Sequence, residues 1–117
     1  MSTATNIKLF EEKKVWTVWN EEKEERYFSV VDVVGILTDQ PTQDGARNYW
    51  KMLKKRLIEE GNEPITNCNQ LKLPAQDGKM SLIDVASIEH IFRIIQFIPS
   101  PKAEPFKLWL ANKRKQK

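Results

Sequence analysis

Residues Asp44 to Gly61 read DGARNYWKMLKKRLIEEG and carry two patterns at helical spacing. At about 100° per residue, four apolar residues share one side of a helix: Ala46, Trp50, Leu53 and Leu57. Four basic residues share a different side: Arg47, Lys51, Lys54 and Lys55. Gly61 is a natural end for this helix, because glycine takes a positive φ at little cost. We predict one helix that buries its apolar side and presents its basic side to a polyanion, most simply nucleic acid.

The alternative for the basic side is a plain solvated surface, where most lysines lie. Like charges four residues apart, such as Arg47 with Lys51, cost a helix some stability, and no acid within that side relieves them. An external anion would relieve them. If about five such bases met phosphates, log K on duplex DNA would fall with log salt at a slope of roughly −4 to −5.

Three neighbouring residues have side chains that suit contact with bases. Arg47 and Asn48 carry groups able to read base edges. Tyr49, at the boundary of the apolar side, is able to stack on a base or to pack inward. Trp50 lies on the apolar side with Leu53, which favours core packing over stacking.

The composition is that of one globular domain. The chain has 117 residues, of which 40% are hydrophobic and 30% charged, with a formal net charge of +3. We expect a single domain over residues 1–117, with residues 1–5 and 112–117 flexible. The lone Cys68 excludes an internal disulfide and favours a reducing compartment, so we expect a cytoplasmic protein. The N-terminus shows no basic-then-apolar leader, and the apolar-rich run 88–98 is too polar to span a bilayer.

The N-terminal third predicts strands followed by a helix. Residues 7–10, 15–19 and 26–28 are rich in β-branched and aromatic side chains and are separated by charged turns. Ser29 and Asp32 have the spacing of a capping box, which predicts a helix over residues 30–37.

The remainder predicts a loop, a hairpin and two helices. Residues 62–68 are polar and contain a proline, so we expect a loop. Residues 71–73 and 79–80 flank the turn signal Asp77-Gly78, and their pairing would form a wing whose Lys72 and Lys79 touch a nucleic-acid backbone.

The sequence Ser81-Leu82-Ile83-Asp84 repeats the capping pattern and predicts a helix from there to about Ile98, with Ser87 as an alternative point at which the helix restarts. A last helix follows Ser100, with an inward side at Ala103, Phe106, Trp109 and Leu110. Lys113 and Arg114 then belong to a solvated tail, to a second phosphate contact or to the start of a link to a further segment. The fold class is α+β, a small antiparallel sheet packed with four to five helices.

Enzyme chemistry finds little support. The single histidine, His90, has no cysteine near it in sequence, so a zinc site of usual spacing is absent. Nothing local marks Cys68 and His90 as a nucleophile and its base, and no glycine-rich phosphate loop occurs. We expect a non-catalytic protein without a cofactor or metal.

Several blocks of the chain resemble a known family. They are Tyr49-Trp50 with Leu53-Lys54 and Arg56-Leu57, then Asp77-Gly78-Lys79, the block 98–106 (IPSPKAEPF) and Trp109-Leu110-Ala111. Together they are similar to the Bro family N-terminal domain, and within it to phage antirepressors and bacterial proteins of the DNA-damage-inducible protein D type. The resemblance covers residues 7–111, and 98–111 is its most specific part. The chain departs from the family at Ser81, where many relatives have a larger or basic residue, and at the basic run 113–115.

The resemblance implies a DNA-binding domain, usually at the N-terminus of a longer protein, that regulates transcription or phage state, sometimes by countering a repressor. The partners implied are double-stranded DNA and a repressor protein. It supplies no set of DNA-reading residues, so the predicted contacts follow from helix geometry and charge: Arg47, Asn48, Lys51, Lys54, Lys55, Lys72, Lys79, Lys113 and Arg114. The alternative is a protein-interaction module that counters a repressor and barely touches DNA.

Overall fold

The first part of the chain forms a three-stranded antiparallel meander. The computed structural model describes residues 3–74 and 78–113, without the side chains of residues 3–6 and 74. Strands β1 (Thr3–Phe10), β2 (Lys13–Asn20) and β3 (Glu25–Ser29) pair in chain order. The sequence predicts all three, although β1 begins earlier than Ile7 because its pairing with β2 extends to Thr3.

Two capped helices follow the meander as the sequence predicts. Helix α1 (Val30–Leu37) begins after Ser29, whose Oγ accepts a hydrogen bond from the N–H of Asp32 at 3.4 Å. Helix α2 (Gln43–Glu59) begins after Thr42, whose Oγ1 accepts from the N–H of Gly45 at 3.0 Å. Helix α2 stops two residues before Gly61, whose φ of 82° turns the chain away from the helical path.

The segment after Gly61 differs from the expected loop by one short helix, α3 (Glu63–Thr66). Proline is compatible with the first turn of a helix, where its missing N–H would have no helical partner, so Pro64 does not prevent α3. The predicted hairpin is present: β4 (Asn69–Pro74) pairs antiparallel with β5 (Met80–Ser87). Asp77, in its expected turn, lies outside the described residues.

The predicted helix start at Ser81 is wrong, because residues 80–87 form strand β5. The same letters also alternate as a strand, with Ile83 and Val85 buried on one face. Strands β3 and β4 pair with β5 on its two sides and so satisfy its backbone groups. Asp84 is therefore not a helix-capping residue.

The last two helices close the domain. Helix α4 (Ile88–Ile95) is capped by Ser87, whose Oγ accepts from the N–H of His90 at 3.3 Å, and it ends before Ile98. Helix α5 (Ala103–Lys113) packs against the first strand. Its Trp109 Nε1–H donates to the carbonyl oxygen of Leu9 at 2.7 Å, and its Phe106 ring lies 5.1 Å from that of Phe10.

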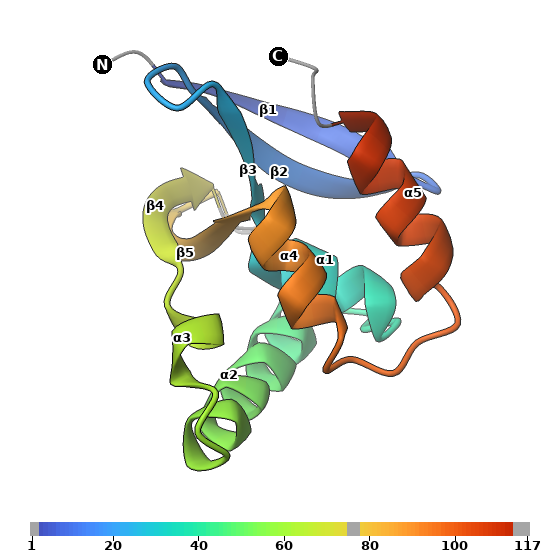
Figure 1. Cartoon of the computed structure of the whole chain (residues 1–117). Coiled ribbons are helices and arrows are strands. Elements are labelled where there is room, and N and C mark those ends of the chain that lie inside the picture. Colours follow the sequence, from blue (N-terminus) through green and yellow to red (C-terminus); the bar gives the residue numbers. More distant parts are fainter. Residues whose placement is uncertain (1–2, 75–77, 114–117) are drawn as a thin grey trace.

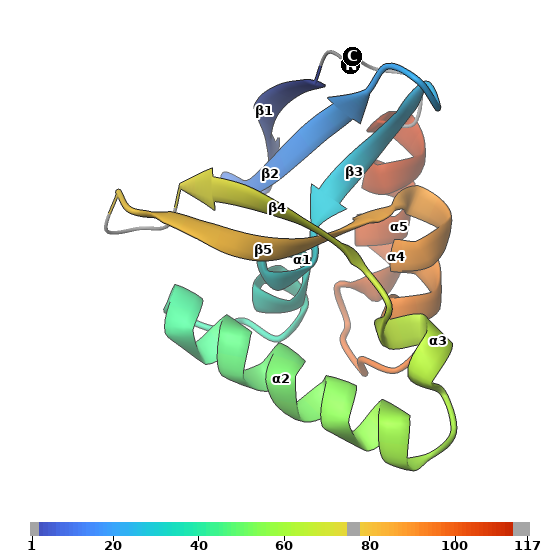
Figure 2. The ribbon, with the colours of Figure 1, turned by 90° about the vertical axis from the view of Figure 1, so that its left-hand side faces the viewer.

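The sheet has the order β1-β2-β3-β5-β4, and helices cover one of its faces (Figure 1). The main core lies between that face and helices α1, α2, α4 and α5. The sheet is strongly twisted (Figure 2), and its other face holds a second cluster: Val18, Tyr27, Leu73, Ile83 and Val85. The described residues thus form a single α+β domain with a five-stranded antiparallel sheet and five helices, which confirms the predicted fold class.

The true start of α4 is testable with two serine substitutions. Ser87→Ala removes the helix cap and should lower the free energy of unfolding by about 1 kcal/mol. Ser81→Ala should change it by less than about 0.5 kcal/mol, because Ser81 lies within β5 and caps no helix. Chemical denaturation measures both. Equal losses, or a larger loss at Ser81, would contradict the strand assignment.

Candidate nucleic-acid interface

The apolar side of α2 fixes how this helix faces the rest of the molecule. All four predicted residues are buried in the main core: Ala46, Trp50, Leu53 and Leu57. Tyr49 is half-buried at the boundary, as predicted. With this side held inward, the flank that starts at Arg47 points toward the β4–β5 hairpin, which lies along α2 (Figure 2).

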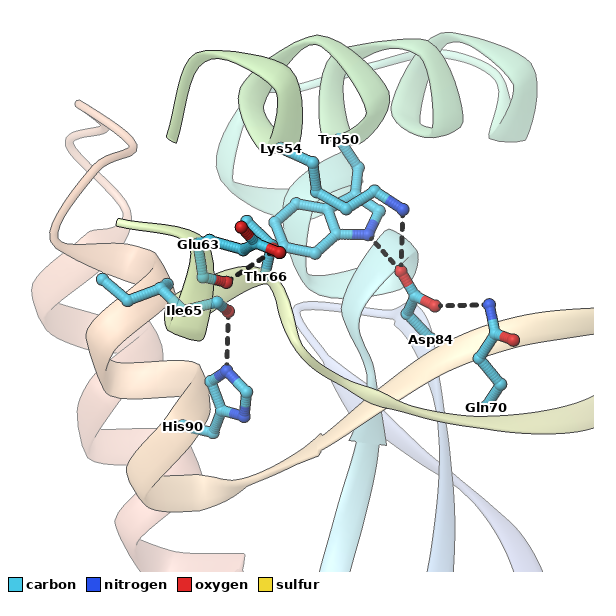
Figure 3. Close-up of polar contacts among 8 residues, drawn as sticks. All are labelled: Trp50, Lys54, Glu63, Ile65, Thr66, Gln70, Asp84 and His90. Atoms are coloured by element: carbon cyan, nitrogen blue, oxygen red, sulfur yellow. Dashed lines mark hydrogen bonds and ion pairs between the residues drawn. The ribbon is translucent and has the colours of Figure 1, made fainter. Parts of the chain in front are cut away.

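A carboxylate from β5 connects α2 to the hairpin (Figure 3). Asp84 Oδ2 accepts hydrogen bonds from Trp50 Nε1 at 2.7 Å and from Lys54 Nζ at 3.0 Å. Its Oδ1 accepts from Gln70 Nε2 at 3.1 Å. Burial by itself raises the pKa of Asp84, but these three donors outweigh it and leave the pKa lowered. Asp84 is therefore ionised at neutral pH and holds three side chains from two other elements.

This contact changes the role expected of Lys54. The basic side of α2 contains no acid of its own, but Asp84, from β5, forms an ion pair with Lys54. The Lys54 side chain is 34% exposed, and its Nζ lies 5.4 Å from the centre of the Trp50 ring. Sequence reasoning could not find this acid, because it assigned Asp84 to a helix start rather than to a strand beside α2.

A small cavity of about 180 Å³ lies between α2 and the hairpin. Its lining includes three of the predicted cations and three hairpin residues: Arg47, Lys51, Lys54, Gln70, Leu82 and Asp84. Arg47 Nη2 is buried and has no hydrogen-bond partner among the residues that the structure describes. An anion in this cavity would meet a buried guanidinium donor in surroundings that strengthen the interaction.

The hairpin adds a further predicted cation to the same face. Lys72 pairs directly opposite Leu82, and Gln70 pairs directly opposite Asp84. Since alternate residues of a strand share a face, Lys72 lies on the side of the hairpin that carries the contact with α2. Lys79 is exposed, immediately before β5.

Two other predicted residues of α2 do not line this cavity. Lys55 is exposed on α2, one turn beyond Lys51. Asn48 lines a separate groove of about 460 Å³ on the opposite flank of α2, together with Tyr49 and Arg56.

The C-terminal cations are not brought to this face. Lys113 is at the end of α5, with its Nζ 5.6 Å from the centre of the Trp109 ring. Figures 1 and 2 place that end of α5 on the far side of the molecule from α2. Arg114 lies outside the described residues.

Cys68 and His90 have surroundings unlike a catalytic pair. Burial raises the pKa of the Cys68 thiol to about 12, so the nucleophilic thiolate is scarce at neutral pH. His90 Nε2 lies 2.7 Å from the carbonyl oxygen of Ile65, so this nitrogen carries a proton and donates it (Figure 3). Within residues 3–74 and 78–113, no three His, Cys, Asp or Glu side chains are placed to hold a metal ion.

Comparison with known proteins identifies the family. Residues 14–115 match the profile of the BRO family, N-terminal domain. The chain belongs to this family. No curated protein and no solved structure matches it. The BRO N-terminal domain is a DNA-binding regulatory domain of the phage antirepressor type, and the family is not known as catalytic.

Sequence reasoning missed the polar and exposed residues of the hairpin that line the cavity of this BRO N-terminal domain, which are Gln70, Leu82 and Asp84. The available signal was the alternation of residues 83–85, in which Ile83 and Val85 point one way while Asp84 points the other. None of the helices in the described part of the domain has the length and apolar character needed to cross a membrane.

The Asp84 contact makes a pH-dependent contribution to stability. Asp84→Asn removes the negative charge and replaces one carboxylate oxygen by an amide NH2 group, which cannot accept a hydrogen bond from the donors around it. The free energy of unfolding at neutral pH should therefore fall by about 2 kcal/mol. Because the folded-state pKa of Asp84 is lowered, its contribution is full above the unfolded value of about 3.9 and is lost as pH falls through the folded value. The difference between wild type and variant should therefore shrink in acid, which denaturation at a series of pH values measures. A difference that stays constant with pH would sink this account.

Proposed function

We propose that this domain binds duplex DNA through backbone phosphates at the face formed by α2 and the β4–β5 hairpin. The observation that carries the proposal is the cavity lined by Arg47, Lys51 and Lys54, with the buried Nη2 of Arg47 left without a partner in the described part of the chain. Lys72 belongs to the facing hairpin. A polyanion laid along this face would meet cations from both elements.

The charge state of α2 supports an external anion. Arg47, Lys51 and Lys55 have no carboxylate within ion-pair distance among the described residues, whereas Lys54 is paired with Asp84. The three unpaired cations recur at four-residue intervals and so repel one another along the helix. Phosphates would replace that repulsion with charge-assisted hydrogen bonds.

The proposed role is regulatory and non-catalytic, in the control of transcription or of phage state. We place it in the cytoplasm, since the lone Cys68 is half-buried as a free thiol. Action as an antirepressor that contacts a repressor protein with little DNA binding is the competing function, and the salt titration described next separates the two.

Salt-dependent binding tests the proposed face. The double variant Lys51→Ala/Lys55→Ala should reduce the slope of log K against log salt by about 2, because each lost phosphate contact removes about 0.9. The matched control is Lys14→Ala/Lys23→Ala, which removes the same charge from exposed positions on and after β2. Fluorescence anisotropy with a labelled mixed-sequence duplex measures both slopes.

Equal slope changes in the two double variants would show that the interface lies elsewhere. Absence of binding by the wild type at low salt would remove the DNA-binding proposal and leave the protein-interaction function.

A further inference from the structure

Two large apolar side chains of β5, near the cavity between α2 and the hairpin, are exposed to solvent. Met80 is 60% exposed and Leu82 is 62% exposed. On the same strand, Ile83 and Val85 are almost completely buried in the second cluster. The strand thus buries Ile83 and Val85 on one face and leaves the first part of its other face, at Met80 and Leu82, uncovered.

The uncovered face looks toward α2. Leu82 is two residues before Asp84, and Met80 is two residues before Leu82, so all three share one face of β5. Asp84 reaches Trp50 and Lys54 of α2 from that face (Figure 3). Leu82 lines the same cavity as Arg47. The two exposed side chains therefore continue the wall of this cavity toward the beginning of β5.

Cations surround this apolar pair. Lys72 is the cross-strand neighbour of Leu82, Lys79 precedes Met80 in the chain, and Lys51 lies on the helix across the cavity. The matching ligand has anionic edges around an apolar interior. A groove of duplex DNA has this chemistry, with phosphates along both edges and thymine methyl groups on its floor.

We propose that the paired strands β4 and β5 lie in the major groove and that Met80 and Leu82 contact thymine methyl groups. This rests on the proposed DNA-binding function and adds the residues that contact bases. The major groove admits a two-stranded β-ribbon, and contact with thymine is the apolar part of its code. In this arrangement α2 and Lys72 bind the flanking phosphates. Met80 and Leu82 contribute to the free energy of binding through apolar contacts, which salt does not screen.

The test combines a protein substitution with a DNA substitution. The probes are an A·T-rich duplex and the same duplex with every thymine replaced by uracil, which lacks only the methyl group. Wild type should bind the thymine duplex about fourfold more tightly, the value of one buried methyl group. Met80→Ala/Leu82→Ala should lose this preference and bind the thymine duplex about tenfold more weakly, with the salt slope unchanged.

Two controls keep the result interpretable. Leu9→Ala/Leu108→Ala removes two other exposed apolar side chains, 56% and 69% exposed, and should leave the affinity and the thymine preference intact. Lys51→Ala/Lys55→Ala should lower the salt slope and retain the preference. Thermal unfolding checks that each variant is folded.

The outcomes separate this inference from the function on which it rests. A thymine preference that persists in Met80→Ala/Leu82→Ala, or a fall in its salt slope, overturns the inference while DNA binding stands. A change from dimer to monomer in that variant also overturns it, since a second copy would then cover the pair. Failure of wild type to bind either duplex overturns the proposed function itself.

Discussion

The carboxylate of Asp84 is the interaction on which the candidate interface depends. Removing a carboxylate from water is costly unless hydrogen bonds and an opposite charge replace its hydration. Trp50, Lys54 and Gln70 supply that replacement, and they come from α2 and β4. The contact therefore joins the helix to the hairpin across the cavity that Arg47, Lys51 and Lys54 line.

The two sides of α2 carry energies of different size. Burying each large apolar side chain contributes about 1.5–3 kcal/mol, whereas a pair of like charges one turn apart costs about 0.2–0.5 kcal/mol. Trp50, Leu53 and Leu57 are all buried, so packing outweighs the repulsion among the basic residues by a wide margin. The helix therefore stays folded although the basic residues on its exposed side repel one another, and these residues remain available to bind an external anion.

Local patterns predicted most of the fold. The period of Trp50, Leu53 and Leu57 identified the buried side of α2, and the Ser29 cap identified the start of α1. The wrong prediction of a helix start at Ser81 has a physical cause, because the same residues fit both a helix-capping pattern and the alternation of a strand. Pairing with β4 and with β3, a segment more than fifty residues earlier in the chain, decides between them. The same limit hid the Lys54–Asp84 contact, while the basic side of α2 needed only helical spacing.

The bond from Trp109 to the backbone of Leu9 joins segments that are 100 residues apart in sequence. During synthesis β1 emerges from the ribosome long before α5, the helix that covers it. Until α5 has emerged, the ring of Phe10 lacks its packing contact with the ring of Phe106. Contacts of such long range slow folding, because the chain loses loop entropy before it gains their stabilisation. The domain can therefore reach its complete native packing only after α5 has emerged from the ribosome.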